Sequence, residues 1–420
     1  MHRDACRLLA NLLSDPELFP DEEPARPLEK RYAGRPLTVQ TLFGAVEVRR
    51  HYYHHPPSQT GRCPRDEKLG LVGRFSPAVA RLMCQAAARS GSYAQAAHDL
   101  RRYAGVEIET RAFDRLVEEV APALAEALAS LPAATVAPPI TVGYCSVDGT
   151  GVPMRRAELA GRAGRQPDGT AKTREAKLGA VFTQTVTDED GQPLRDPDST
   201  SYVGTFAGSA DLGLLLQQEA RRRGVDRAPQ TVFLGDGSAW GWEIARLHFP
   251  EATQILDFYH AAEYVGELAA LLFPSEEATR RRQREEWLQE LKATDPSAML
   301  AEAKQLAAAG AFSAEEIETI HSKIAYFENQ AGRTRYGEFR AKGYFIGSGV
   351  IEAGCKCVVG RRLKQSGMFW SEAGAENLLR LRCLLLGPYA SAAWAARPQI
   401  VAQHQAKARR WLPPELAAAG

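Results

Sequence analysis

The N-terminal third of the chain shows an alternating pattern followed by helical spacing. Residues 34–55 read GRPLTVQTLFGAVEVRRHYYHH, and their alternation predicts two short strands that turn at Gly44. A loop rich in proline and glycine, HHPPSQTGRCPRDEKLGL, follows. Helical spacing over 76–89 and through SYAQAAHDLRRYAGVEIETRAFDRLVEEVAPALAEAL predicts three helices, with Thr110 as the N-cap of the third. The last two fit a helix-turn-helix DNA-binding module, and they fit a structural helical pair equally well.

The middle of the chain has the pattern of alternating strands and helices. After the linker SLPAATVAPP, strands are predicted over 140–152, 175–187 and 200–207, with a basic loop at 155–172 between the first two. A helix over 209–223, a strand in QTVFLGDG, another helix and a strand in TQILDFYH complete the series. This order is that of an α/β fold with a ribonuclease H-like core and a mixed sheet.

A long helical pattern then interrupts this core. It runs from residue 261 to about 338, and it lengthens the interval between Asp236 and Glu352 far beyond what a strand and one helix need. We therefore expect an all-helical insertion. The predicted parts are 1–75 (helix and β-hairpin), 76–130 (helical module), 138–260 (core, first part), 261–340 (insertion), 341–390 (core, second part) and 391–420 (a loosely docked tail).

Composition and charge narrow the picture. The chain has 420 residues, of which 45% are hydrophobic, and its sequence contains no apolar run long enough for a signal peptide or a membrane helix. We therefore expect a cytoplasmic protein that is associated with the nucleoid when it is bound to DNA. Seven scattered cysteines fit a reducing compartment. Net charge is only +1, but residues 334–364 hold seven basic residues against two acidic ones. Positive charge therefore gathers around Glu352.

Three acidic residues lie in glycine-rich segments: Asp148 in SVDGTG, Asp236 in FLGDGSAW and Glu352 in IGSGVIEAGCK. An aspartate beside glycine is most often a turn residue or a helix cap. The three carboxylates are expected at two strand ends and a helix start, and together they predict a site for Mg²⁺, with Mn²⁺ as a substitute. Phosphodiester chemistry uses two such cations, which carboxylates can hold. The neighbouring glycines are expected to let a nucleic-acid backbone come close.

Several segments carry a family resemblance. YCSVDGTGVPM, REAKLGAVFTQT, VFLGDGSAW, ILDFYHAAEY, YFIGSGVIEAGCK and RLKQSGMFWSEAGAENLLRLR resemble the ISKra-type family of bacterial insertion-sequence DDE transposases over residues 140–385. The resemblance implies a transposase that cleaves element ends and joins the 3′ hydroxyl to target DNA. It implies Asp148, Asp236 and Glu352 as the catalytic, metal-binding triad. Its partners would be double-stranded DNA and further copies of the chain.

Asp257 and His260 match a further feature of related transposases, an acidic residue or a cysteine followed three positions later by histidine. We expect His260 to act at the substrate phosphate or a flipped base, with Asp257 as its accessory residue. The spacing also fits a histidine that only caps the following helix. Glu175 is a second accessory candidate, which could orient Asp148 or pair with Lys177 at the surface.

Basic residues after Glu352 are candidates for DNA contacts. Helical spacing places them near the face that carries Glu352, where phosphate contacts would position DNA, although a solvated charged face has the same pattern. The DNA-binding candidates are Lys356, Arg361, Arg362, Lys364, Lys177 and Arg333.

A zinc site is the weaker prediction for the N-terminal hairpin. Family members carry paired cysteines after the YY of the hairpin, whereas this chain has His51, His54, His55 and a single Cys63. This spacing lacks the two CxxC knuckles of a zinc ribbon, so we expect a degenerate, zinc-free hairpin.

Two other functions remain open at this point. A ribonuclease H-like nuclease would use the same carboxylates, although the insertion and the N-terminal module argue against it. A catalytically inactive, transposase-derived DNA-binding protein would keep the fold without the chemistry.

Overall fold

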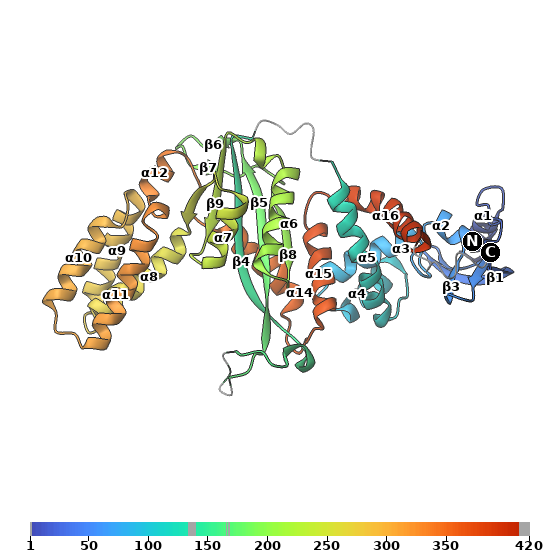
Figure 1. The fold of residues 1–420 in the computed structure, drawn as a ribbon, viewed down its shortest axis with the longest axis horizontal. Helices are drawn as coiled ribbons and strands as arrows, with labels where there is room; N and C mark the ends of the chain where they lie inside the picture. The colour runs from blue at the N-terminus through green and yellow to red at the C-terminus, as the bar shows by residue number, and fades with distance from the viewer. Residues whose placement is uncertain (1, 133–139, 165, 167–168, 411–420) are drawn as a thin grey trace. The chain divides into compact units, whose positions relative to one another are not determined.

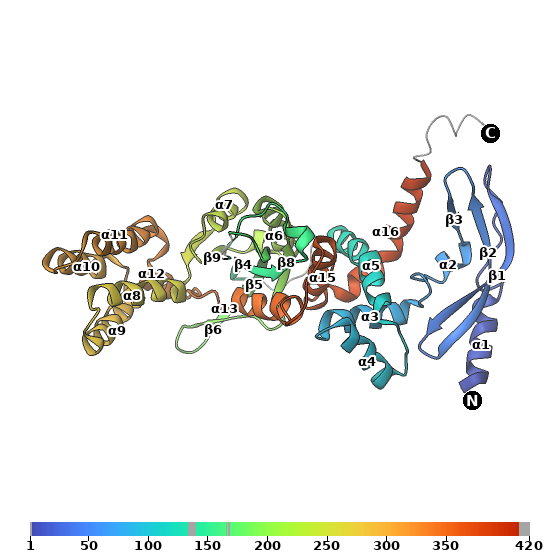
Figure 2. The ribbon, with the colours of Figure 1, turned by 90° about the horizontal axis from the view of Figure 1, so that it is seen from below.

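A computed structural model describes residues 2–132, 140–164, 166 and 169–410, and Figure 1 and Figure 2 show its ribbon in two views. The chain forms two units. The first combines the part up to Leu131 with Gln365–Leu385 and the segment from Tyr389 onward, and the second holds Pro132–Lys364 and Leu386–Pro388. The expected core over 138–260 and 341–390 is therefore divided at Lys364, and the linker residues 133–139 lie outside the described part.

The second unit is built on a mixed five-stranded sheet. Its strands are β4 (Val142–Pro153), β5 (Thr173–Gln184), β8 (Ser201–Thr205), β9 (Gln230–Gly235) and β10 (Thr253–Leu256). The order is β10-β9-β4-β5-β8, with β4, β9 and β10 parallel to one another, and β5 antiparallel to β4 and β8. Helix α6 (Ser209–Arg222) follows β8, and α7 (Ala239–His248) joins β9 to β10. The predicted mixed sheet is confirmed, and its strands and helices follow the predicted order. The predicted strand over 175–187 ends at Gln184, and β6 (Val186–Thr187) pairs instead with β7 (Pro193–Leu194) in a separate two-stranded sheet.

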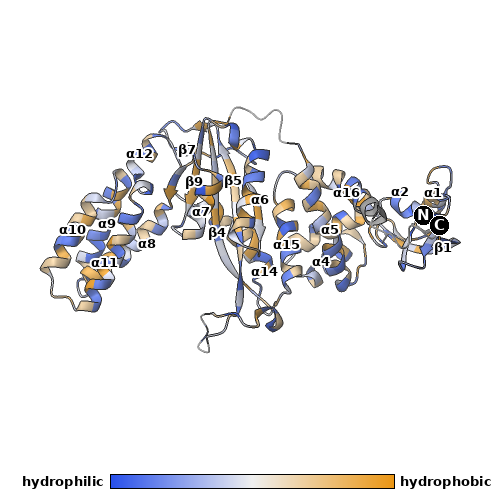
Figure 3. Ribbon diagram, in the orientation of Figure 1, coloured by the Kyte–Doolittle hydropathy of each residue, from blue (hydrophilic) through white to orange (hydrophobic). Residues whose placement is uncertain are grey.

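Burial explains why the central strands form. The first six residues of β4, 142–147, are all buried, as expected for a strand with elements on both faces. Figure 3 shows the apolar residues of these strands in orange. The shorter strand β10 ends before the predicted DFYH because Asp257 caps the next helix, accepting a hydrogen bond from Tyr259 N at 3.1 Å.

The helical insertion is present and begins slightly earlier than predicted. Its helices are α8 (Phe258–Leu272), α9 (Glu277–Ala293), α10 (Ser297–Ala309), α11 (Ala314–Asn329) and α12 (Tyr336–Ala341). Trp287, Phe327 and Tyr336 are fully buried in one hydrophobic cluster that continues into the sheet residues. The insertion is thus packed as part of the second unit.

The chain returns from the insertion beside the point where it left the sheet. Phe258 N donates to Ile346 O at 2.9 Å, and the helix α13 (Gly349–Gly354) follows, then a π-helical turn (Cys355–Gly360) and α14 (Arg361–Leu363). A Cβ on Gly354 would lie 2.5 Å from the Tyr202 ring, so glycine lets α13 approach the sheet closely. This places Glu352 next to the strands.

The first unit holds a small sheet and a group of helices. Its elements are α1 (His2–Ser14), β1 (Lys30–Thr41), β2 (Gly44–His55), β3 (Thr60–Arg62), α2 (Pro64–Lys68), α3 (Pro77–Arg89), α4 (Tyr93–Ala104), α5 (Thr110–Ser130), α15 (Glu372–Leu385) and α16 (Ala390–Arg410). Among the described residues, no helix is both long and apolar enough to cross a membrane.

Three local predictions for this unit need correction. The hairpin has a third strand, β3, and its turn is formed by residues 42 and 43, with Gly44 already opening β2 at φ +111°. The predicted loop after the hairpin contains β3 and α2. The N-cap of α5 is Glu109 rather than Thr110, because Glu109 is still extended while Thr110 is the first helical residue.

The two C-terminal helices pack in the first unit. Helix α15, which was expected in the second part of the core, contacts α3 and α5, and α16 also contacts α5. The prediction of a loosely docked tail is therefore wrong for 391–410, where Ala393 and Ile400 are buried. The rest of that prediction, 411–420, lies outside the described residues.

Two adjacent alanines test the docking of α16. Ala393 is fully buried, whereas Ala392 is exposed on the same helix. Ala393→Asp would bury an unpaired carboxylate, so we expect the free energy of unfolding to fall by about 2 kcal/mol or more. Ala392→Asp makes the same change in helix propensity, but it should lower the free energy of unfolding by well under half of that amount. Equal losses in thermal unfolding of the two variants would contradict the docked helix.

Candidate metal centre

Two of the predicted carboxylates lie at one edge of the sheet. Asp148 follows the six buried residues of β4, and Asp236 comes directly after β9. These strands are parallel, with Ser146 opposite Leu234, so the two aspartates occupy matching positions two residues further on. Adjacent strands lie roughly 4.8 Å apart, which brings the side chains into electrostatic contact.

Asp257 ties this edge to the end of the insertion. It is fully buried, and both of its carboxylate oxygens accept hydrogen bonds. Oδ1 accepts from Tyr259 N and Ser348 N, each at 3.1 Å, while Oδ2 accepts from Ser348 Oγ at 2.7 Å and lies 3.2 Å from His260 Nδ1. Burial raises the pKa of Asp257, but these hydrogen bonds outweigh it and hold that pKa below its usual range. Asp257 is therefore an anion that holds its neighbours in place.

Glu352 reaches the same place from α13. Ser348, which Asp257 holds, is the N-cap residue of that helix, and Glu352 follows one turn later. One ligand atom from each of Asp257, His260 and Glu352 lies within 4.8 Å of the others. Lys356 is the nearby counter-ion, with Nζ 3.6 Å from Glu352 Oε2.

The electrostatics connect all these groups through His260. The hydrogen bond to Asp257 raises the pKa of His260 to about 9, and the charges of Asp257, Asp236 and Glu263 add to this effect. Burial raises the pKa of Asp148, and so does the charge of Asp236, while the positive charge of His260 acts in the opposite direction. Asp148 and Asp236 therefore lie within electrostatic range of His260, and Glu352 has a ligand atom within 4.8 Å of one on His260.

The donor set fits a divalent cation. Asp148, Asp236 and Glu352 offer carboxylate oxygens, which Mg²⁺ and Mn²⁺ prefer. Burial beside Asp236 disfavours the charged form of Asp148, and a bound cation would relieve this repulsion. Asp257 fits less well as a ligand, because its oxygens are already occupied by hydrogen bonds. We regard it as the residue that positions His260 and Ser348.

Cys355 also belongs to this cluster, although it was not among the predicted site residues. Burial raises the pKa of Asp148, and the hydrogen bond between the Cys355 thiol and that carboxylate offsets part of the rise. Cys355 comes three residues after Glu352, and residues at this spacing share a helix face. That spacing was the available signal, but a lone cysteine does not reveal which strand it will meet.

Two of the glycines beside the carboxylates have a different role from the one predicted. Gly237 has φ +98°, and a Cβ there would lie 2.6 Å from Tyr326 Oη. A Cβ on Gly347 would lie 2.8 Å from the ring of Tyr259. At both positions the space is taken by the protein's own aromatic side chains, so the expectation of room for a nucleic-acid backbone is corrected for Gly237 and Gly347. Gly349 has open space around it, and there the expectation stays a prediction.

The basic candidates after Glu352 differ in exposure. Lys356, Arg361 and Lys364 are exposed, and Lys364 Nζ donates to Thr150 Oγ1 at 2.8 Å. Arg362 is only 1% exposed, because the π-helical turn before it changes the helical register. The expectation that Arg362 lies on an accessible face is therefore corrected.

The remaining candidates already have protein partners. Lys177 forms an ion pair with Glu175, and its Nζ lies 5.3 Å from the centre of the Trp240 ring. Of the two predicted roles of Glu175, orienting Asp148 or pairing with Lys177, the structure therefore contains the ion pair. Arg333 stacks 4.4 Å over the Trp242 ring and donates to Gln254 Oε1 at 2.8 Å. These contacts restrict both side chains, and DNA binding by either one stays a prediction.

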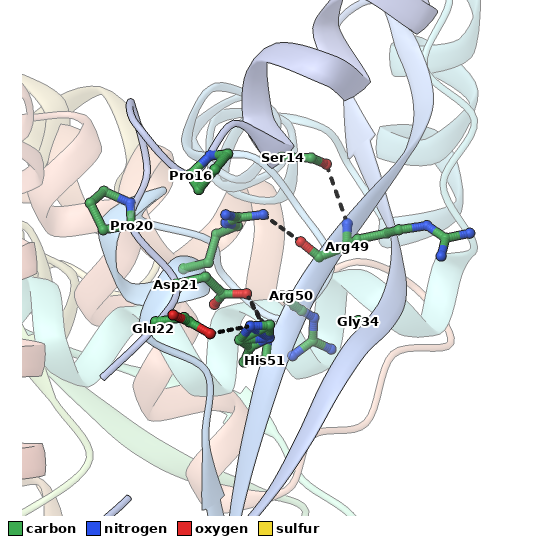
Figure 4. Close-up of a pocket in the computed structure, with 10 residues that line it drawn as sticks. Ser14, Pro16, Pro20, Asp21, Glu22, Gly34, Arg49, Arg50 and His51 are labelled. Carbon is green, nitrogen blue, oxygen red and sulfur yellow. Dashed lines mark hydrogen bonds and ion pairs between the residues drawn. The ribbon is translucent and has the colours of Figure 1, made fainter. Parts of the chain in front are cut away.

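The four zinc candidates of the hairpin have separate partners. His51 lies 3.5 Å from Asp21 and 3.7 Å from Glu22 in a pocket of about 480 Å³ (Figure 4). The others are engaged elsewhere: His54 stacks on Tyr52, His55 bonds Ser58, and Cys63 contacts Arg50. Burial also raises the pKa of Cys63 to about 12, which disfavours the thiolate that zinc requires.

Comparisons with known proteins give little further guidance. No family model matches the sequence, and no curated protein matches it. Among solved structures, the chain is similar to the Drosophila P element transposase strand transfer complex, at 9% identity over 82% of this chain and 89% of that chain, with a TM-score of 0.28.

The coupling of His260 to Asp257 can be measured by titration. In metal-free protein, Asp257→Asn should lower the His260 pKa from about 9 toward the ordinary 6.5. The raised pKa stabilises the fold fully below pH 6.5, and that contribution is lost as the pH rises through about 9. Histidine NMR resonances report the change. Glu263→Gln is the control, with a smaller drop expected, and a His260 pKa that Asp257→Asn leaves unchanged would refute the coupling.

Proposed function

We propose that this chain is a DNA transposase of an insertion sequence, with a ribonuclease H-like core that cleaves and joins phosphodiesters using divalent cations. The observation that carries the proposal is the position of His260, which interacts electrostatically with Asp148 and Asp236 on two strands and has a ligand atom within 4.8 Å of one on Glu352 from a helix. The strand order β10-β9-β4-β5-β8 supports the core assignment. The ISKra-type resemblance agrees with both.

Each residue has a proposed role. Asp148, on the central strand, would hold both cations, with Asp236 and Glu352 holding one each. When bound, Mg²⁺ or Mn²⁺ would activate the attacking oxygen and neutralise charge on the phosphate. His260, charged at neutral pH and oriented by Asp257, would donate a hydrogen bond to a substrate phosphate oxygen.

The same site would serve two successive reactions. In the first, water attacks the phosphodiester at the element end and frees a 3′ hydroxyl. In the second, that hydroxyl attacks target DNA by an in-line displacement. Two ends must be held together for this, so the proposal includes a homo-oligomer bound to double-stranded DNA. The exposed Lys356, Arg361 and Lys364 beside Glu352 are proposed to contact DNA phosphates.

Cation binding can be tested without DNA. Mn²⁺ should raise the melting temperature of the wild-type protein, because it binds the folded state alone. Asp148→Asn and Glu352→Gln should weaken this binding by about tenfold or more, since each removes a negatively charged ligand. Asp226→Asn serves as a control, because Asp226 is exposed and lies before the opposite end of β9 from Asp236. Identical Mn²⁺ titrations in all four proteins would argue against the site.

The reaction can be tested on duplexes that carry the sequences flanking the coding region. Asp236→Ala should reduce 3′-end cleavage and strand transfer by about a hundredfold or more, because a carboxylate ligand is lost. The exposed Asp226, just before β9, provides the control Asp226→Ala, which should retain activity.

The other outcomes separate the alternatives. Undiminished cleavage by Asp236→Ala would refute the triad. Cleavage by the wild type without joining would favour a nuclease. Binding of end DNA without cleavage in Mg²⁺ or Mn²⁺ would favour the inactive DNA-binding protein.

A further inference from the structure

Strands β4 and β5 extend past the rest of the sheet as a two-stranded arm. β9 pairs with β4 only as far as Ser146, and the pairing of β8 with β5 stops at Lys177. β4 and β5 nevertheless continue to pair from Gly149 opposite Lys177 to Pro153 opposite Thr173. The arm is visible in Figure 1 below the sheet. It begins directly after Asp148, so the arm and the candidate metal centre are continuous along β4.

A basic pocket lies at this arm. It has a volume of about 430 Å³, and its charged lining residues are Arg162, Arg174, Lys177 and Glu175. Three segments contribute: the loop between the strands, β5 itself, and the residues that lead into α6. Three positive side chains against one negative favour an anion.

The pocket is held in shape by contacts with its own walls. Arg174 Nη2 donates to Phe206 O at 3.3 Å, and Lys177 is placed by Glu175 and the Trp240 ring. The start of α6 adds little, because the N–H of its N-cap residue Gly208 is taken by Asp211 at 3.1 Å. The preference for an anion therefore rests on the basic side chains.

The register gives the distance along the arm between Asp148 and Arg174, which lies at the outer end of this pocket. Lys177, at the inner end, pairs with Gly149 directly beside Asp148. Arg174 pairs with Val152, four residues beyond Asp148 on the same strand. At roughly 3.3 Å per residue this is about 13 Å. Successive phosphates of one strand of B-DNA advance about 3.4 Å along the helix axis, so the interval corresponds to about four nucleotides.

We propose that this pocket binds, at its Arg174 end, a backbone phosphate of DNA lying along the arm, about four nucleotides from the phosphate at the metal centre. The inference rests on the proposed function, and it names the path of the DNA. Arg162 and Arg174 are the new phosphate contacts. They position the DNA without reading its sequence.

The salt dependence of DNA binding tests the pocket. The intact protein is titrated with a mixed-sequence duplex at several NaCl concentrations without divalent cation. The double variant Arg162→Gln/Arg174→Gln should bind more weakly, with a slope of log K against log [salt] shallower by about one, because one phosphate contact is lost. Glutamine can still donate to Phe206 O, and the melting temperature checks folding.

A matched control lies on α9. Arg281 and Arg282 line a pocket of about 440 Å³ that also holds Glu277 and Glu285, so its charge is balanced. Arg281→Gln/Arg282→Gln removes the same charge and should leave the slope unchanged. An equal change of slope in both double variants would overturn the inference, as would an unchanged slope in a folded Arg162→Gln/Arg174→Gln protein.

Two further measurements sharpen the result. In a duplex that carries the sequences flanking the coding region, a methylphosphonate placed about four phosphates from the cleaved bond should weaken binding by the wild type and have little effect on the double variant. The wild type could instead bind inorganic phosphate at this pocket and the double variant lose that binding, while the salt slope of DNA binding stays the same in both proteins. That result would show a site for free anions and overturn the DNA assignment. The salt slope of DNA binding is measured without cleavage and so does not depend on the triad. Undiminished cleavage by Asp236→Ala would therefore refute the triad without changing the conclusion about the phosphate pocket.

Discussion

The second unit depends on the hydrogen bonds around the buried carboxylate of Asp257. An ion without solvent exposure is costly unless several donors satisfy it, and here they come from Tyr259, His260 and Ser348. Tyr259 and His260 lie where the insertion begins, and Ser348 lies just after it ends. One interaction therefore fixes both ends of the insertion, the start of α13 and the orientation of His260.

This arrangement explains how a carboxylate so far along the chain reaches the sheet. Closing a long segment costs conformational entropy, but the cost grows only slowly with length. The hydrophobic cluster that includes Phe327 and Tyr336 joins the insertion to the strands, and Tyr336 Oη donates to Leu256 O at 3.0 Å. Packing thus brings the two ends of the insertion together, and Asp257 sets their final geometry. Glu352 follows Ser348 by one helical turn.

Charge balance links the site to its proposed chemistry. Asp148, Asp236, Asp257 and Glu352 surround His260, whose positive charge offsets part of their repulsion. Divalent cations would take over that compensation at the carboxylates, and a negatively charged substrate would then meet a site whose charge is already neutralised. The basic pocket on the arm is proposed to compensate the charge of a further phosphate outside the metal centre.

Local patterns in the sequence were enough to predict the element order, the mixed sheet, the insertion and the positions of Asp148 and Asp236, because apolar runs and helical spacing act over a few residues. The sequence could not reveal that Arg362 is buried, that Cys355 meets Asp148, or that α15 and α16 pack on α5. Each of these depends on which distant element supplies the partner, and an amphipathic helix shows only that it has an apolar face. The choice of partner is made by packing of the whole fold.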